Sequence, residues 1–260
     1  FAGFASILRN ELPHLEAAAR ELLTINMGAT AIGTGICAEP GYAEKSTAAI
    51  AKITGHKYIL ADDLVGATSD TSSLAGYSSA LRMIALKMNK ICNDLRLLSS
   101  GPRCGLNEIN LPPMQPGSSI MPGKVNPTQC ESVTMVAVQV MGNDAAIGFA
   151  ASQGNFELNV FMPVMIYDFL QSARLLTDSL KSFNDRCAVG ITANREKMHE
   201  NLHRSLMLVT ALNPYIGYEN AAKTAHKAFD ENISLKEACV ALGFLTAEKF
   251  DAVFHPEEMV

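Results

Sequence analysis

Apolar residues recur every three or four positions over three long stretches of the chain. In residues 72–98 this helical spacing continues without interruption. Residues 132–151 and 158–182 repeat it with apolar side chains on nearly every side, which is typical of helices buried between neighbours. The pattern predicts an all-α fold built on a bundle of long helices. Because one chain has few helices to cover these faces, we also expect an oligomer.

Shorter elements lie on either side of these stretches. Residues 1–23 have the pattern of one amphipathic helix. Residues 235–242 are predicted to form another helix, whose N-terminus is stabilised by a capping box of Ser234 and Glu237. Strand signals are nearly absent, the best being residues 57–60. We therefore expect a central helical-bundle domain over residues 1–187, followed by a small helical C-terminal domain over residues 188–260.

Composition places the chain among globular proteins. It has 260 residues, of which 48% are hydrophobic and 18% charged, with a formal net charge of −5. A disordered chain would have fewer apolar residues and more charge. Runs of Lys and Arg are missing from the sequence, so we expect no nucleic-acid partner and no membrane surface as a partner. Polar residues interrupt even the richest apolar stretch, so no membrane span is expected.

The cysteines and histidines give no sign of a metal centre. Six cysteines lie far apart and never form C-x-x-C, which argues against zinc knuckles and favours a reduced, cytoplasmic protein. The six histidines are interpreted as solvated or core residues.

One segment, residues 99–127, is rich in Pro and Gly and cannot be helical throughout. Within it, Gly117 and Gly123 supply hinge-like backbone freedom. Lys124 offers a cation and Asn126 an amide donor, a combination that suits a carboxylate and the negative charge that develops on it. A serine could remove a proton from carbon if backbone amides from Ser119, Ile120 and Met121 stabilised its alkoxide. The alternative interpretation is a mobile surface loop.

The string Gly117-Ser118-Ser119-Ile120-Met121-Pro122-Gly123-Lys124-Val125-Asn126 resembles the signature of the aspartase/fumarase superfamily. The resemblance extends along the chain, from residues 28–35 through 93–96 and 100–103 to 212–218. The resemblance covers the central and C-terminal portions of the chains of this family. The N-terminal part that supplies further substrate ligands in these proteins is expected to be absent from this chain. One departure is Cys37, where relatives usually carry Asn.

The resemblance implies a lyase that eliminates a leaving group from a C4 dicarboxylate to give fumarate. It implies Ser118 as the catalytic base, supported by Ser119 and the amides of Ile120 and Met121, with Lys124 and Asn126 as carboxylate ligands. Glu131 matches the acid that orients a histidine from another segment; alternatively, it is an acidic residue that stabilises a helix N-terminus. The resemblance further implies no metal or organic cofactor, and a homotetramer in which three subunits build each site.

Two leaving groups remain open within the superfamily. Residues 127–131, 154–161 and 205–212 resemble class II fumarases, whereas residues 67–71, 91–100 and 107–112 are closer to aspartases. The segment that follows the base favours fumarase, and with it malate and fumarate as the substrate pair. Aspartate ammonia-lyase is the first alternative. A catalytically silent helical scaffold is the second.

Overall fold

The protein is described by a computed structural model over residues 1–117 and 120–259. The chain divides into two compact units, one of residues 1–97 with 111–191 and one of residues 98–110 with 192–260. Long helices packed together dominate the first unit, and short helices make up most of the second. The predicted all-α fold is confirmed.

The first unit consists of helices and one pair of two-residue strands. The strands β1 (Thr24–Ile25) and β2 (Ile59–Leu60) pair in parallel, with Thr24 opposite Ile59. β2 lies within residues 57–60, the segment with the strongest predicted strand character. In chain order, the helical segments are α1 (Ala2–Arg9), α2 (Leu12–Glu21), α3 (Tyr42–Thr54), α4 (Gly66–Ser69), α5 (Ser72–Leu98), α6 (Thr128–Ala151), η1 (Asn155–Glu157), α7 (Met162–Arg186) and η2 (Ala188–Gly190).

The three predicted long helices all form, with the boundaries of α6 and α7 shifted by about one turn. α5 spans residues 72–98 as predicted, and α6 begins at Thr128, a turn before the predicted start. α7 begins at Met162 rather than at residue 158. Pro163 explains this shift, because proline lacks a backbone N–H and fits best in the first turn of a helix.

The predicted N-terminal helix over residues 1–23 is wrong, since α1 and α2 are separate helices. The break falls at Asn10 and Glu11, just before Pro13 in the first turn of α2. The carboxylate of Glu11 pairs with the ammonium group of Lys87 on α5. Lys87 Nζ also donates a hydrogen bond to the carbonyl of Ile7 at 3.0 Å. The ammonium group of Lys87 on α5 therefore contacts the chain on both sides of the break between α1 and α2.

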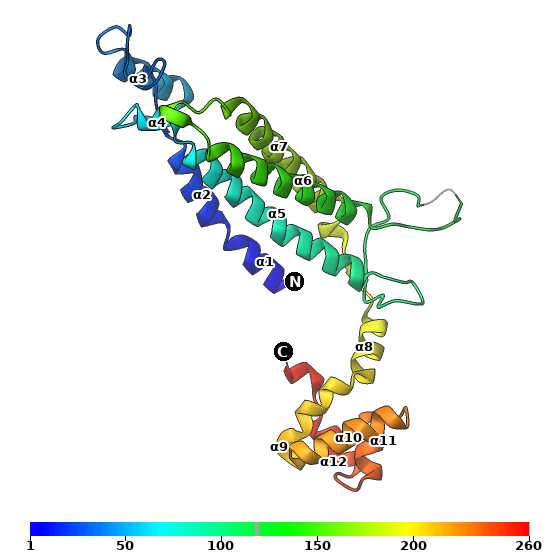
Figure 1. The fold of residues 1–260 in the computed structure, drawn as a ribbon. Coiled ribbons are helices and arrows are strands. Elements are labelled where there is room, and N and C mark those ends of the chain that lie inside the picture. Colours follow the sequence, from blue (N-terminus) through cyan, green and yellow to red (C-terminus); the bar gives the residue numbers. More distant parts are fainter. Residues whose placement is uncertain (118–119, 260) are drawn as a thin grey trace. The chain divides into compact units, whose positions relative to one another are not determined.

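Helices α5, α6 and α7 lie side by side and share the core of the first unit (Figure 1). Small side chains allow close approach: Ala85 on α5 and Ala137 on α6 are both 0% exposed. Asp144 on α6 ties to α5 by accepting a hydrogen bond from Ser78 Oγ at 2.7 Å and pairing with Arg82 Nε at 2.7 Å. The buried members of this core are Leu81, Ala85, Ala137, Val140, Ile147, Ala150, Met165, Phe169 and Leu176.

A buried amide joins α6 to α7. Asn143 is 5% exposed, and its amide nitrogen donates to Ser172 Oγ at 3.0 Å and Gln171 Oε1 at 2.9 Å. The same nitrogen lies 3.2 Å from the carbonyl of Asp168, while the amide oxygen accepts from Gln139 Nε2 at 2.8 Å. Every polar atom of the Asn143 side chain is therefore satisfied inside the bundle.

By length and composition alone, α6 is apolar enough to cross a membrane. A core helix of a protein bundle passes the same test, so this finding does not contradict the expectation that the chain has no membrane span. The helix extends to Thr128, and its few polar residues, Asn143 among them, do not outweigh the apolar ones. The face of α6 that carries Asn143 packs against α7, which is the behaviour of a helix inside a protein bundle.

The second unit is a small helical assembly with one antiparallel strand pair, β3 (Ile109–Asn110) with β4 (Thr192–Ala193). The predicted capping box forms: Ser234 Oγ accepts from the Glu237 N–H at 3.1 Å, and Glu237 accepts from the Ser234 N–H at 2.8 Å. The helical segments are α8 (Arg195–Arg204), η3 (Leu206–Leu212), α9 (Asn213–Ile216), α10 (Tyr218–Asp230), α11 (Leu235–Ala241), α12 (Ala247–Val253) and η4 (Pro256–Met259). The buried core residues are Leu208, Leu212, Ala228, Leu235, Ala238, Cys239 and Phe250.

We expect Asn143→Ala to lower the free energy of unfolding by about 2–3 kcal/mol, because it leaves buried polar partners on α7 without a donor. Urea unfolding followed by circular dichroism measures this change. Asn184→Ala, at an exposed position on α7, is the matched control and is expected to change stability by less than about 0.5 kcal/mol. Equal losses in the two variants would contradict a stabilising role for the buried network.

Candidate functional site

The signature segment lies in the first unit and leads directly into α6. Its described residues are Gly117 and 120–126, while Ser118 and Ser119 lie outside the described residues. The structure therefore places the ends of the predicted catalytic segment and all of its predicted carboxylate ligands. It leaves the predicted base itself unplaced.

A short backbone contact closes the base of this segment. The N–H of Gly117 donates to the carbonyl of Lys124 at 2.7 Å, and Pro116 and Val125 form an antiparallel bridge next to it. Gly117 is required by this closure, because a Cβ atom at this position would lie 2.3 Å from the Lys124 carbonyl oxygen. The segment between them is thus a loop whose two ends are fixed to each other.

A second glycine allows the loop to turn before Lys124. Gly123 has φ +77°, a left-handed conformation that L side chains rarely adopt. The turn lets the N–H of Lys124 donate to the carbonyl of Met121 at 3.2 Å. The side chains of Ile120 and Met121 are exposed, at 83% and 47% respectively. Their predicted role concerns their backbone amides and does not depend on these side chains.

The predicted ligands Lys124 and Asn126 stand immediately before the N-terminus of α6. In the single chain Lys124 is exposed and Asn126 is partly buried. The carbonyl of Asn126 accepts from the N–H of Thr128, the first residue of α6, at 2.9 Å. The helix dipole adds positive potential at this end of a 24-residue helix. The arrangement suits an anion such as a carboxylate.

Glu131 occupies the first turn of α6 and is partly buried. Its N–H donates to the carbonyl of Pro127 at 3.0 Å, and its own carbonyl accepts from Thr134 Oγ1 at 2.8 Å. The described contacts do not join the side chains of Lys124, Asn126 and Glu131 to one another. A carboxylate at this place is favourable for the helix dipole, so both interpretations of Glu131 fit the geometry.

The first turn of α6 is anchored by contacts that the sequence did not suggest. Ser182 Oγ on α7 donates to Gln129 Oε1 at 2.8 Å. Next to Glu131, the thiol of Cys130 is 0% exposed and contacts the buried thiols of Cys92 on α5 and Cys187 at the end of α7. These cysteines are far apart in the sequence. Their only signal was that each stands at an apolar position of a helix.

This environment keeps Cys130 and Cys187 in their protonated form. The Cys187 hydrogen bond by itself lowers the pKa of Cys130, but the bond to Cys92 and burial outweigh it and raise that pKa to about 12. The Cys130 hydrogen bond and burial likewise raise the pKa of Cys187. Both thiols therefore act as apolar packing behind the first turn of α6.

Cys37, the position at which the family resemblance leads us to expect Asn, has φ +64° and an exposed side chain. A left-handed backbone favours Asn or Gly over other residues. The conformation of residue 37 is therefore one that Asn adopts more readily than Cys.

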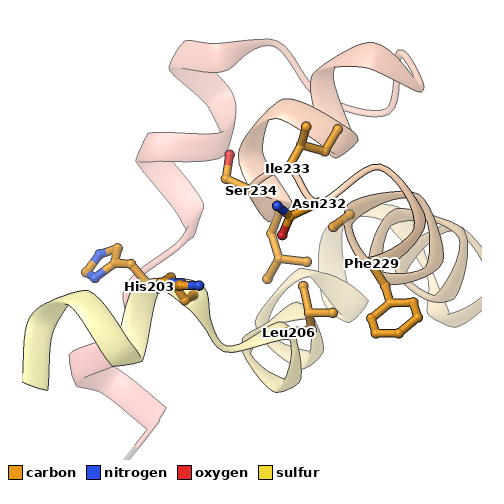
Figure 2. Close-up of a pocket in the computed structure, with 9 residues that line it drawn as sticks. His203, Leu206, Phe229, Asn232, Ile233 and Ser234 are labelled. Atoms are coloured by element: carbon orange, nitrogen blue, oxygen red, sulfur yellow. The ribbon is translucent and has the colours of Figure 1, made fainter. Parts of the chain in front are cut away.

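A cavity of about 370 Å³ lies in the second unit (Figure 2). It includes none of the predicted site residues. Its lining residues are His203, Arg204, Leu206, Ala228, Phe229, Asn232, Ile233, Ser234 and Leu235.

The sequence of the first unit agrees with a known protein family. The family described as Lyase matches residues 1–142, which include the closed loop and Glu131, and the family described as Fumarase C C-terminus matches residues 208–260. The chain belongs to the lyase family. The resemblance read from the loop signature is therefore confirmed.

Individual members of the lyase family show the same relationship. The class II fumarate hydratase of Helicobacter pylori is 54% identical over 260 residues, which are 100% of this chain and 56% of that protein. The crystal structure of class II fumarase from Schistosoma mansoni matches with a TM-score of 0.94 at 38% identity, covering 99% of this chain and 57% of that one. A fumarate lyase:delta crystallin structure from Brucella melitensis matches with a TM-score of 0.92 at 43% identity, covering 99% and 56%. The chain thus spans little more than half the length of these relatives.

The closure of the loop predicts different outcomes for its two glycines. Gly117→Ala is expected to break the Gly117–Lys124 hydrogen bond through the clash of its Cβ, so that the amide of residue 117 exchanges its hydrogen with solvent faster. Gly123→Ala meets no neighbouring atom and is expected to cost about 1 kcal/mol from backbone strain, while the amide of residue 117 stays protected. Hydrogen exchange followed by NMR distinguishes the variants. Protection of residue 117 in Gly117→Ala would show that the clash is relieved elsewhere.

The buried thiols predict selective alkylation. At pH 8 iodoacetamide is expected to modify the exposed Cys37 and Cys104, while Cys130 and Cys187 stay unmodified. Iodoacetamide reacts with the thiolate, and Cys130 and Cys187 are buried and have raised pKa values, so they form little of it. Mass spectrometry of peptides measures each site, and the denatured chain, in which all six react, is the control. Modification of Cys130 at the rate of Cys37 would contradict the packing of α5, α6 and α7 around it.

Proposed function

We propose that this chain is part of a class II fumarate hydratase, which interconverts malate with fumarate and water. The observation that carries this proposal is the 54% identity with the Helicobacter pylori enzyme over all 260 residues. The aligned region includes residues 67–71 and 91–100, which taken alone resemble aspartases. Similarity to a hydratase over the full chain outweighs these short segments.

In the proposed reaction Ser118 removes a proton from the malate carbon next to one carboxylate. The electron pair moves into that carboxylate to give its aci form, and the hydroxyl group leaves the neighbouring carbon, with a proton, as water. Ser119 and the amides of Ile120 and Met121 stabilise the serine alkoxide. Support comes from the described ends of this segment, where Gly117 donates a hydrogen bond to the Lys124 carbonyl and the chain then leads into the N-terminus of α6.

Lys124 and Asn126 hold the carboxylate that gains charge in this step. A cation and an amide donor placed before a helix N-terminus stabilise the aci form more than the substrate, and this difference lowers the barrier. The removal of one such donor typically costs about 10²–10³ in kcat. Glu131, one helical turn further along, orients the histidine that another segment supplies.

The rest of the pocket comes from other subunits in this proposal, which envisages a homotetramer with each site shared between three subunits. The exposure of Lys124 in the single chain agrees with a site that other chains complete. So do the exposed apolar side chains of the long helices, which single-chain solubility does not explain. On α6 and α7 the most exposed of these are Met135, Val138, Phe149 and Tyr167.

The proposed location is the cytoplasm. All six cysteines, each among the described residues, are free thiols. Free thiols in several core positions suit a reducing compartment.

Product identification tests the proposed function. The protein, in the assembled form that carries the whole active site, is incubated with fumarate in plain buffer and then with added ammonium, and NMR identifies the product. We expect malate under both conditions. Aspartate formed with ammonium would assign the chain to the ammonia-lyases, and an unchanged fumarate signal would support a catalytically silent scaffold.

The base is tested in the same assay. Ser118→Ala is expected to lower kcat by about 10²–10⁴, the usual contribution of a proton-transferring group, with oligomer size unchanged. Ser152→Ala, at the C-terminal end of α6, is the matched control and is expected to keep full activity. Full activity in Ser118→Ala would remove this residue from the role of base.

A further inference from the structure

Helix α8 of the second unit carries two histidines one turn apart. His199-Glu200-Asn201-Leu202-His203 has the H-E-x-x-H spacing, which places both imidazoles on one face of a helix. In the structure the two rings stack, with centroids 4.0 Å apart and planes inclined by 29°. The i,i+4 spacing thus brings the two imidazoles into direct contact.

A backbone contact fixes which ring nitrogen of His203 is free. Its Nδ1 lies 2.9 Å from the carbonyl oxygen of His199. A carbonyl can only accept a hydrogen bond, so Nδ1 carries the hydrogen and the neutral ring keeps the lone pair on Nε2. A histidine that donates one N–H to a carbonyl while its other nitrogen is free has the arrangement usual for metal ligands.

We propose that His199 and His203 form a two-ligand site for a divalent late transition-metal ion such as Zn²⁺. Zinc–nitrogen bonds of about 2.0–2.1 Å with tetrahedral angles set two ligand nitrogens about 3.3 Å apart. The i,i+4 spacing places both imidazoles on one face of α8 with their centroids 4.0 Å apart, and rotations about the side-chain bonds that unstack the rings turn one nitrogen of each toward a shared ion. Both side chains are exposed, which lets water complete the coordination shell.

Neighbouring charges set the character of this site. The carboxylate of Glu200 pairs with Lys197 at 2.9 Å and Arg204 at 3.3 Å, and the hydrogen bond from Lys197 lowers the pKa of Glu200. The Glu200 carboxylate is therefore engaged by two cations and is not counted among the ligands of this site. No group of three or more metal-ligating side chains occurs among the described residues. The site differs in this respect from catalytic zinc centres, which use three protein ligands, and the ion is expected to exchange readily.

The ion would lie on the outer side of α8. Figure 2 shows the imidazole of His203 turned away from Leu206 and Asn232, which border the cavity of the second unit. His203 is one of the residues that line this cavity, so the proposed site lies at the edge of the cavity. It shares no residue with the Gly117–Asn126 loop.

Zinc titration of the protein by isothermal calorimetry tests the proposal. Because exposed thiols also bind zinc, all variants carry Cys37→Ser and Cys104→Ser. The parent is expected to bind one Zn²⁺ per chain. The His199→Gln and His203→Gln variants are each expected to bind Zn²⁺ at least about tenfold more weakly. The reason is that a single remaining histidine lacks the gain in affinity that two linked ligands provide. His226→Gln, an exposed histidine on α10, is the matched control and is expected to leave binding unchanged.

Paramagnetic resonance with Cu²⁺ gives an independent count of ligands. The parent is expected to show coupling to two imidazole nitrogens, and each α8 variant coupling to one. Absence of zinc binding by the parent overturns the proposal, and so does an equal loss of binding in His226→Gln. Fumarate hydration measured on the same samples reports on the loop and not on α8, so the failure of one proposal is distinguishable from the failure of the other.

Discussion

The packing of α6 against α5 and α7 is the constraint on which the rest of the first unit depends. Asn143 on α6 bonds to partners on α7, and Asp144 beside it bonds to Ser78 and pairs with Arg82 on α5. Polar contacts with fixed partners select one register between helices that are otherwise apolar on most sides. Because Lys124 and Asn126 immediately precede α6, this register also sets where they stand relative to the bundle.

Much of the fold could be predicted from the sequence because it is local. The period of residues 72–98 gave α5, and Ser234 with Glu237 gave the start of α11. The break between α1 and α2 was missed because the apolar stripe continues across it. That break involves Pro13 and the contact of Glu11 with Lys87, a residue distant in the sequence.

The candidate site was predictable as a set of residues but not as a geometry. The sequence motif identified Lys124 and Asn126, and the family resemblance added Glu131. The glycines of the motif explained why the chain turns there. The clash that makes Gly117 necessary involves a carbonyl seven residues later, and periodicity carries no information about such a contact. The contact between Cys92, Cys130 and Cys187 could not be predicted from the sequence either, because it depends on how three helices pack. The positions of Ser118 and Ser119 lie outside the described residues, so their roles stay predictions.

The closed base of the loop has a consequence for how a change in the loop affects the helix that follows it. A segment whose ends bond to each other, Gly117 to Lys124, can change its tip without pulling on the helix that follows. The contacts of Asn143 with α7 and of Asp144 with α5, which set the register of α6, lie more than three helical turns away from this closure. A substitution at Gly117 is therefore felt at the loop and not in the packing of the bundle.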